Sequence, residues 1–443
     1  MNHISSAEPT HFESLYPPDS RKEEIEKIIS YIKSGNSAQV ISLPGVGRSN
    51  VLRLLAYNTK ARTLHLGENQ KWFHFVMLNF SEIKKRPLSD STKYMFLELV
   101  DSLQERKMDE EYKFTKNILD ECIKSEDELV IFQGFKKTID YLCLQKELTI
   151  VLLFDKFEEY VSVVEPIFFE NLKVLRDRVK YRFSTVFPLN RPLEETVGHE
   201  TLSTFYEFLV GNLVYLTLAD EKIRSFRLSY IEKLAGKNVD KNVLNEIMRL
   251  TGGLGKLWLV SVNTCIQEDL KNNISDSLLK NTQTKAVLSE IWKSLTPFEQ
   301  NLIINGKVHE STHLVAVGLV KNNKFAVPLL EAYAKNPSGG LGIKRTITYD
   351  GQTNEIKRGE IILSEGLTSS EFKLLKFLVT NPEKILGRDE IVNGVWGNQA
   401  STAGVTEQAL DQLIFRLRKK IEENPNAPTH IQTVKGRGFK FTA

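Results

Sequence analysis

The sequence predicts an α/β domain with a parallel sheet in its first half. It also predicts a C-terminal domain of three helices closed by a strand hairpin. A buried strand over 39–43 runs directly into a glycine turn and a helix, and an apolar strand over 148–154 ends in Asp155. Helical periodicity over 368–421 is followed by two short strands around a second glycine turn. The 443 residues, 41% hydrophobic and 26% charged, suffice for two or three domains with their own cores.

The first half is expected to begin as a flexible arm over 1–20, followed by the α/β domain over 21–200. The strand, glycine turn and helix near residue 45 form the context that a phosphate-binding loop requires, since N–H groups at a helix N-terminus can cradle phosphates. An ordinary turn between a strand and a helix is the alternative. The candidate nucleotide-binding residues are Gly45, Gly47, Arg48, Ser49, Asn50, Asp155, Asn190 and Lys256.

This loop departs from the usual pattern G-x-x-x-x-G-K-[ST]. Ser42 takes the first glycine position and Arg48 the lysine position, whereas Gly47 and Ser49 match. Lysine is a compact point charge and arginine a longer planar fork, so the exchange is not neutral. We therefore expect weak binding of ATP or ADP.

Asp155 ends a buried strand, where an acid can reach Mg²⁺ at the carboxyl edge of a parallel sheet. Ser49 and Asp155 are the candidate Mg²⁺ ligands if nucleotide binds, and a plain strand-end aspartate is the alternative. Lys156 follows and cannot act as an acid that orients water at neutral pH. Glu158 is the one possible catalytic residue, so little or no hydrolysis is expected. Asn190, after a strand over 181–187, can sense a phosphate or lie in a solvated turn.

Several segments resemble the STAND and origin-recognition-like branch of P-loop ATPases, which is related to AAA+ proteins. They are SLPGVGRSNVLRLLA, TIVLLFDKFEEY, FPLNRPLEE and NEIMRLTGGLGKLWLVSVN. The resemblance implies a helical lid over 201–280, in which Lys256 approaches the nucleotide; a helix-surface lysine is the alternative. Residues 281–335 resemble the small winged-helix module that follows such lids and are interpreted as a packing or autoinhibitory module. Residues 336–342 are expected to form a flexible linker.

The C-terminal domain is expected over 343–443. Thr368 and Glu371 form a capping-box pattern at the start of its first helix. Its third helix has an apolar stripe and an amide-and-guanidinium front, and the hairpin that follows has a basic tip. From Asp411 onward, seven basic residues face three acidic ones. Three helices followed by a basic hairpin define a winged helix, which favours DNA binding over a bundle with a solvated charged face.

The segments LTSSEFKLLKFLVTNP, GRDEIVNGVWG, ALDQLIFRLRKKIE and HIQTVKGRGFKF resemble the effector domain of OmpR/PhoB-type response regulators. The resemblance implies a small antiparallel sheet before the helices, a recognition helix and a wing. Gln408 stands where that family usually has arginine, and Arg437 where its wing usually has valine between glycines. The candidate DNA-binding residues are Gln408, Gln412, Arg416, Arg418, Lys419, Lys435, Arg437 and Lys440.

Together these features predict a DNA-binding transcription regulator whose P-loop-derived part acts as a switch or an oligomerisation module. Double-stranded DNA is the expected partner, with a homo-oligomer on DNA and a possible protein partner or signal at the P-loop part. Two alternatives stay open: an active ATPase such as a mobile-element replication initiator, and a defence or stress sensor with protein partners. Three scattered cysteines, no signal pattern and no long apolar run favour the cytoplasm, away from membranes.

Overall fold

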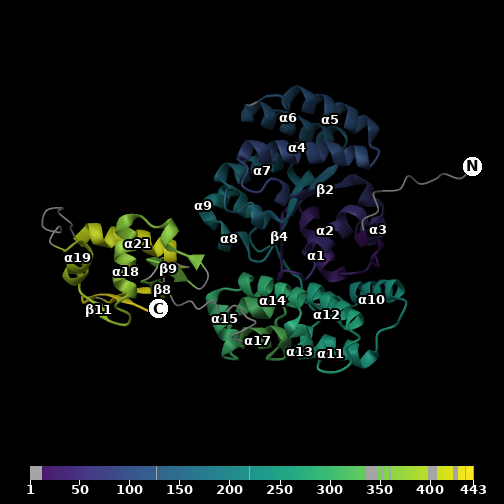
Figure 1. Cartoon of the computed structure of the whole chain (residues 1–443). Coiled ribbons are helices and arrows are strands. Elements are labelled where there is room, and N and C mark those ends of the chain that lie inside the picture. Colours follow the sequence, from purple (N-terminus) through teal and green to yellow (C-terminus); the bar gives the residue numbers. More distant parts are fainter. Residues whose placement is uncertain are drawn as a thin grey trace, which may run out of the picture. The chain divides into compact units, whose positions relative to one another are not determined.

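The computed structural model (Figure 1) divides into two compact units, residues 1–335 and 336–443. It describes residues 12–125, 127–218, 220–335, 347–351, 353–358, 361–397, 407–422, 428–434 and 436–442. The predicted linker over 336–342 and the DNA-contact candidate Lys435 lie outside the described residues. Within these ranges, no helix is both long and apolar enough to cross a bilayer.

The first unit is built on a five-stranded, all-parallel sheet with the strand order β2-β3-β4-β1-β5. β3 is buried at every position, as its unbroken apolar sequence requires for a strand covered on both faces. The strands are β1 Ala38–Ile41, β2 Phe73–Asn79, β3 Thr149–Asp155, β4 Phe183–Leu189 and β5 Leu213–Tyr215. Because all strands are parallel, the phosphate-loop turn, Asp155 and Asn190 meet at one edge of the sheet.

Helices surround this sheet, and α4 packs on β2 with α5 and α6 beyond it (Figure 1). The helices around the sheet are α1 Lys22–Lys33, α2 Arg48–Tyr57, α3 Thr59–Leu66, α4 Leu88–Glu105, α5 Asp109–Cys122, α6 Glu128–Asp140, α7 Pro166–Val179, α8 Leu193–Thr196 and α9 Gly198–Leu202. The sheet continues past the predicted domain end at residue 200, because β5 pairs with β1. Residues 213–215 therefore belong to the sheet and not to the lid.

A helical region follows the sheet and ends in a small hairpin module. Its helices are α10 Glu221–Ala235, α11 Lys241–Thr251, α12 Gly255–Gln267, α13 Ile274–Lys280, α14 Thr282–Ser294, α15 Pro297–Ile304, α16 Thr312–Ala316 and α17 Pro328–Lys335. Strands β6 Val320–Lys321 and β7 Lys324–Phe325 pair around a turn at Asn322 and Asn323. All these elements share one apolar core with the sheet.

The predicted flexible arm over 1–20 is wrong for residues 12–20. Residues 12–15 form a short 3-10 helix, and Tyr16 is buried. The Tyr16 ring meets Phe226 of α10 edge-on at 5.5 Å, and its hydroxyl accepts a hydrogen bond from Arg227 Nε at 2.7 Å. Aromatic side chains spaced along a mostly polar segment provide this anchor.

The second unit has the predicted order of elements. In its described part, an antiparallel sheet precedes three helices, whose buried leucines and isoleucines form a separate core with the final strands. The elements are β8 Ile347–Asp350, β9 Glu355–Arg358, β10 Ile361–Ile362, α18 Ser369–Val379, β11 Ile385–Leu386, α19 Arg388–Trp396, α21 Glu407–Ile421, β12 Ile431–Val434 and β13 Gly438–Phe441. The short strand β11, which the sequence did not predict, adds a third strand to the β12–β13 hairpin.

Candidate nucleotide pocket and nucleic-acid interface

The turn between β1 and α2 has the backbone of an anion-binding loop. Gly45 and Gly47 have φ angles of 80° and 112°, in the left-handed region that favours glycine. A Cβ atom at Gly45 would lie 2.8 Å from Cβ of Lys256, so the lid helix α12 also requires glycine there. Four backbone N–H groups at this turn donate no hydrogen bond to any described residue. They belong to Gly45, Gly47, Arg48 and Ser49. Free donors at a helix N-terminus favour an anion.

The side chain of Arg48 is paired with an acid of the same pocket. Its guanidinium donates to both carboxylate oxygens of Glu158, at 2.7 and 3.2 Å. The backbone N–H of Asn190 donates to the same carboxylate. Glu158, the possible catalytic residue, therefore connects the loop to the end of β4. The side-chain oxygen of Asn190 is buried and has no partner among the described residues.

Ser49 and Asp155, the candidate Mg²⁺ ligands, lie in contact. The Ser49 hydroxyl donates to the Asp155 carboxylate at 2.7 Å, and Asp155 is buried at the end of β3. No group of three or more metal-binding side chains occurs among the described residues. Mg²⁺ in nucleotide sites needs only one or two protein ligands beside the phosphates. This pair therefore fits a Mg²⁺ ion carried by a nucleotide and does not form a metal cage of its own.

A cavity of about 390 Å³ opens over the loop, and six basic and four acidic side chains line it. Lys256 lines it, with its Nζ 2.7 Å from Glu290 and its backbone N–H bonded to the Gly45 carbonyl. Sequence reasoning missed three further basic residues on its wall. They are Arg21, Arg224 and Arg227. No motif marks them, because they come from segments that only the tertiary fold brings to the loop.

Asn50 also lines the cavity, but its side chain has protein partners. With its amide oriented to satisfy both neighbours, it donates to Glu13 at 3.1 Å and accepts from Arg227 at 3.2 Å. The predicted nucleotide residue thus helps to hold the N-terminal segment on the loop.

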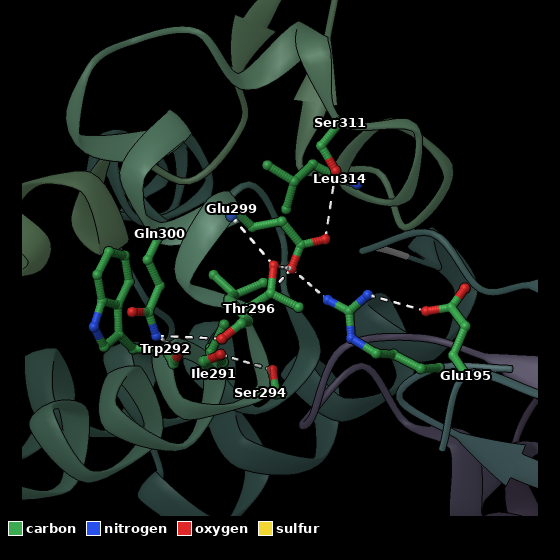
Figure 2. A network of polar contacts seen from close by, with 11 residues as sticks. Glu195, Ile291, Trp292, Ser294, Thr296, Glu299, Gln300, Ser311 and Leu314 are labelled. Atoms are coloured by element: carbon green, nitrogen blue, oxygen red, sulfur yellow. Dashed lines mark hydrogen bonds and ion pairs between the residues drawn. The ribbon is translucent and has the colours of Figure 1, made fainter. Parts of the chain in front are cut away.

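The end of β4 also contacts the small hairpin module. Arg191, which follows Asn190, forms an ion pair with Glu299 and approaches Glu195 at 3.4 Å. Glu299 is buried and accepts from the Thr296 backbone at 2.8 Å, completing the capping box of α15. Figure 2 shows this network around Glu299, which Ser311 joins through its hydroxyl. Asn190 thus contacts Glu158, the partner of Arg48 in the phosphate loop, whereas Arg191, the next residue, contacts the hairpin module.

The candidate recognition helix α21 is divided into a buried and an exposed face. Its buried residues are Leu410, Leu413, Ile414, Leu417 and Ile421. Its exposed front carries Gln408, Gln412, Phe415, Arg416 and Lys419. At 3.6 residues per turn, positions 408, 412, 415 and 419 form one stripe opposite the core, with 416 at its edge.

Two predicted DNA contacts are engaged within the domain. Arg418 donates to the Ile431 carbonyl at 2.6 Å and to the Thr433 hydroxyl at 2.8 Å, and burial lowers its pKa below the ordinary value. Lys440 pairs with Glu383 at 2.5 Å. These contacts fix the hairpin against α21 and the end of α18. Arg437 is exposed at the hairpin turn, beside Gly436 with its φ of 70°.

Comparison with known proteins covers the two units unequally. Residues 364–441 match the family model described as "Transcriptional regulatory protein, C terminal". The phosphate regulon transcriptional regulatory protein PhoB of Klebsiella pneumoniae is 35% identical over 97 residues, which are 22% of this chain and 40% of PhoB. The chain thus spans about two fifths of that relative.

Two solved structures are also similar to parts of the chain. The DNA-binding domain of Klebsiella pneumoniae RstA, solved in complex with RstA box, is 27% identical over 22% of this chain and 91% of its own, with a TM-score of 0.19. A Walker-type ATPase of Pyrococcus abyssi is 12% identical over 71% of this chain and 95% of its own, with a TM-score of 0.44.

The C-terminal unit is an OmpR/PhoB-type winged-helix DNA-binding domain, as its family match and its order of elements agree. The first unit is an α/β domain with a phosphate-loop turn on a parallel sheet.

Proposed function

We propose that the chain is a sequence-specific, DNA-binding transcription regulator of the cytoplasm, with double-stranded DNA as its partner. The exposed stripe of α21 carries this proposal, because it presents amide and basic side chains from a helix whose opposite face is buried. Glutamine and arginine read base edges in the major groove. Arg437 and Lys435 reach the backbone or the minor groove from the wing.

The phosphate-loop pocket takes ATP or ADP with Mg²⁺, weakly. The free N–H groups of the loop support phosphate contacts, and the Ser49–Asp155 pair suits the ion. Lys256 adds positive charge at the wall. Bound nucleotide supplies a multiply charged anion. Lys156, and not an acid, follows Asp155, so little hydrolysis is expected.

The nucleotide acts as a switch through the contacts at the end of β4. An anion in the loop competes with Glu158 for Arg48, since both are negatively charged. Release of Glu158 changes the partner of the Asn190 backbone, and the next residue, Arg191, pairs with Glu299 of the hairpin module. The state of the pocket thereby biases the packing of that module. This sets the oligomeric state on DNA or the exposure of the C-terminal domain, and a protein partner can bias the same equilibrium.

Recovery of bound fragments from a random duplex pool tests the DNA-binding function. The full chain is expected to enrich one sequence family, whereas a Gln412→Ala, Arg416→Ala double variant enriches a different or weaker one. A folded chain that retains no duplex at low salt contradicts the proposal.

Calorimetric titration with Mg²⁺ and ATP or ADP tests the pocket separately. Arg48→Lys is expected to bind more tightly than the native chain, because lysine fits the phosphates better and pairs less firmly with Glu158. Glu158→Gln is expected to bind more tightly as well, since it frees Arg48. No heat from the native chain or from either variant contradicts nucleotide binding. Turnover near one per second, within the ordinary range for enzymes, favours the ATPase alternative.

A further inference from the structure

One large apolar side chain interrupts the polar front of α21. Phe415 is 45% exposed, and among the described residues of 347–442 it is the only large hydrophobic side chain in the exposed class. Its position places it in the middle of the stripe that includes Gln412 and Lys419. An exposed phenyl ring at the centre of a DNA-facing surface needs an apolar partner to be buried favourably.

The neighbours of Phe415 indicate what that partner is. Lys419 places its Nζ 4.8 Å from the centre of the ring, and the other exposed residues one turn away are Gln412 and Asp411, whose carboxylate is paired with Arg388. A surface that joins two copies of a chain is expected to have an apolar centre depleted of charge. Phe415 is a single apolar side chain among amide and charged groups, so the surroundings favour DNA over a second copy.

The major groove offers one apolar feature, the C5-methyl group of thymine. We propose that Phe415 is a specificity-determining residue that packs its ring against a thymine methyl group in the bound site. This inference rests on the proposed DNA-binding function. The ring carries no charge, so it discriminates between sequences without adding a phosphate contact. The salt dependence of binding is therefore set by Lys419 and the wing, and not by Phe415.

Replacement of thymine by deoxyuridine removes this methyl group and leaves every hydrogen-bonding group of the base in place. The probe is the duplex that the full chain enriches from a random pool, together with copies in which each thymine in turn is replaced by deoxyuridine. We expect one thymine per half-site whose replacement weakens binding of the native chain about fourfold, the effect of losing one buried methyl group. Other thymines should respond much less.

The variant Phe415→Ala separates this contact from indirect effects of the methyl group on DNA shape. It should bind the unmodified duplex less tightly than the native chain and no longer distinguish thymine from deoxyuridine at that position. Its salt dependence should equal that of the native chain. Phe415→Leu, which keeps an apolar side chain, should retain part of the discrimination.

Three outcomes would overturn the inference. In the first, no replacement of thymine by deoxyuridine weakens binding of the native chain, a result that needs no variant to interpret. Phe415→Ala can keep the full response to deoxyuridine, or it can change the oligomeric state in sedimentation while the response stays intact, which assigns Phe415 to a protein interface. Absence of DNA binding by the native chain is a different result, because it overturns the proposed function itself.

Discussion

The same five-residue pattern, Leu-Thr-x-x-Glu, begins a helix in each of the two units, at Thr296 and at Thr368. Both form complete capping boxes, and both glutamates have side chains that are only 3% exposed. The third partner differs. Glu299 pairs with Arg191 from the end of β4, whereas Glu371 pairs with Lys420 from the recognition helix. The same capping box thus anchors α15 to the end of β4 in the first unit and α18 to the recognition helix α21 in the second.

The two pairs differ in burial, which decides their energetic weight. The side chain of Arg191 is 17% exposed and that of Lys420 is 39% exposed. Solvent screens an exposed ammonium, and a guanidinium makes more directional hydrogen bonds to a carboxylate. We expect loss of the Arg191–Glu299 pair to lower the stability of its unit more than loss of the Lys420–Glu371 pair does.

The largest effect should come from Arg191→Met, which keeps the aliphatic stem and removes the charge. It leaves the Glu299 carboxylate buried with its capping donors and the Ser311 hydroxyl but no cation, at a cost of about 2–4 kcal/mol in local stability. Hydrogen exchange of α15 measures this as a loss of protection. Lys335→Met on α17 breaks an exposed pair and serves as the control. A loss of protection no larger than the one it causes would show that burial gives the Arg191–Glu299 pair no additional stability.

The recognition helix and the wing are expected to contribute differently to DNA binding. Gln412→Ala is expected to change preference at one base pair by about 1–3 kcal/mol, whereas Lys435→Ala weakens binding to all duplexes about alike. Binding titrations with the enriched duplex and its single-base variants measure both. The reverse result, with the wing altering preference and the helix only overall affinity, exchanges their roles.

Glu371 gives the second capping box a dependence on pH. Burial alone would raise its pKa, but hydrogen bonds from Lys420 and Thr368 lower it below the ordinary value of 4.5. Because the pKa is lower in the folded state, its stabilisation is present above pH 4.5 and is lost as the pH falls through the lower folded value. Glu371→Gln should cost about 1–2 kcal/mol at pH 7.

Unfolding of native and variant chains at a series of pH values, followed through exchange of α18, tests this prediction. The difference between the two should shrink as the pH falls below 4.5. A difference that stays constant through that range would mean that ionisation of Glu371 contributes nothing.

The smallest effect should come from Lys420→Met. Its ammonium is partly exposed, so we expect a loss of about 0.5–1 kcal/mol in the stability of α18. High salt should reduce this difference further. A loss equal to that of Arg191→Met would remove the distinction between the two pairs.

Local signals predicted much of this structure, and long-range contacts account for what was missed. The capping box at Thr368 was predicted from residues three positions apart, and the same spacing begins the helix at Thr296, but nothing in the sequence assigns Arg191 or Lys420 as partners of the two glutamates. β5 and β11 escaped prediction because strands of three and two residues have no readable periodicity. The packing of residues 12–20 also depends on a helix two hundred residues away.

The candidate sites divide in the same way. The glycine turn and Asp155 could be placed from their strands, whereas the pairing of Arg48 with Glu158 and the basic wall of the pocket arise only in the fold. In the recognition helix, periodicity separated the buried from the exposed face correctly. It could not show that Arg418, on the flank of that helix, binds the hairpin backbone.

The most direct test of the central claim is binding of the full chain to the enriched duplex across a series of salt concentrations. The logarithm of the association constant should fall linearly with the logarithm of salt, and Arg437→Ala, in the wing, should make the slope shallower by about one phosphate contact. Lys324→Ala, in the hairpin of the first unit, is the matched control and should leave affinity and slope unchanged. A folded chain that does not bind duplex at low salt, or a Lys324 variant that alone reduces the slope, would contradict the assignment of DNA binding to the second unit.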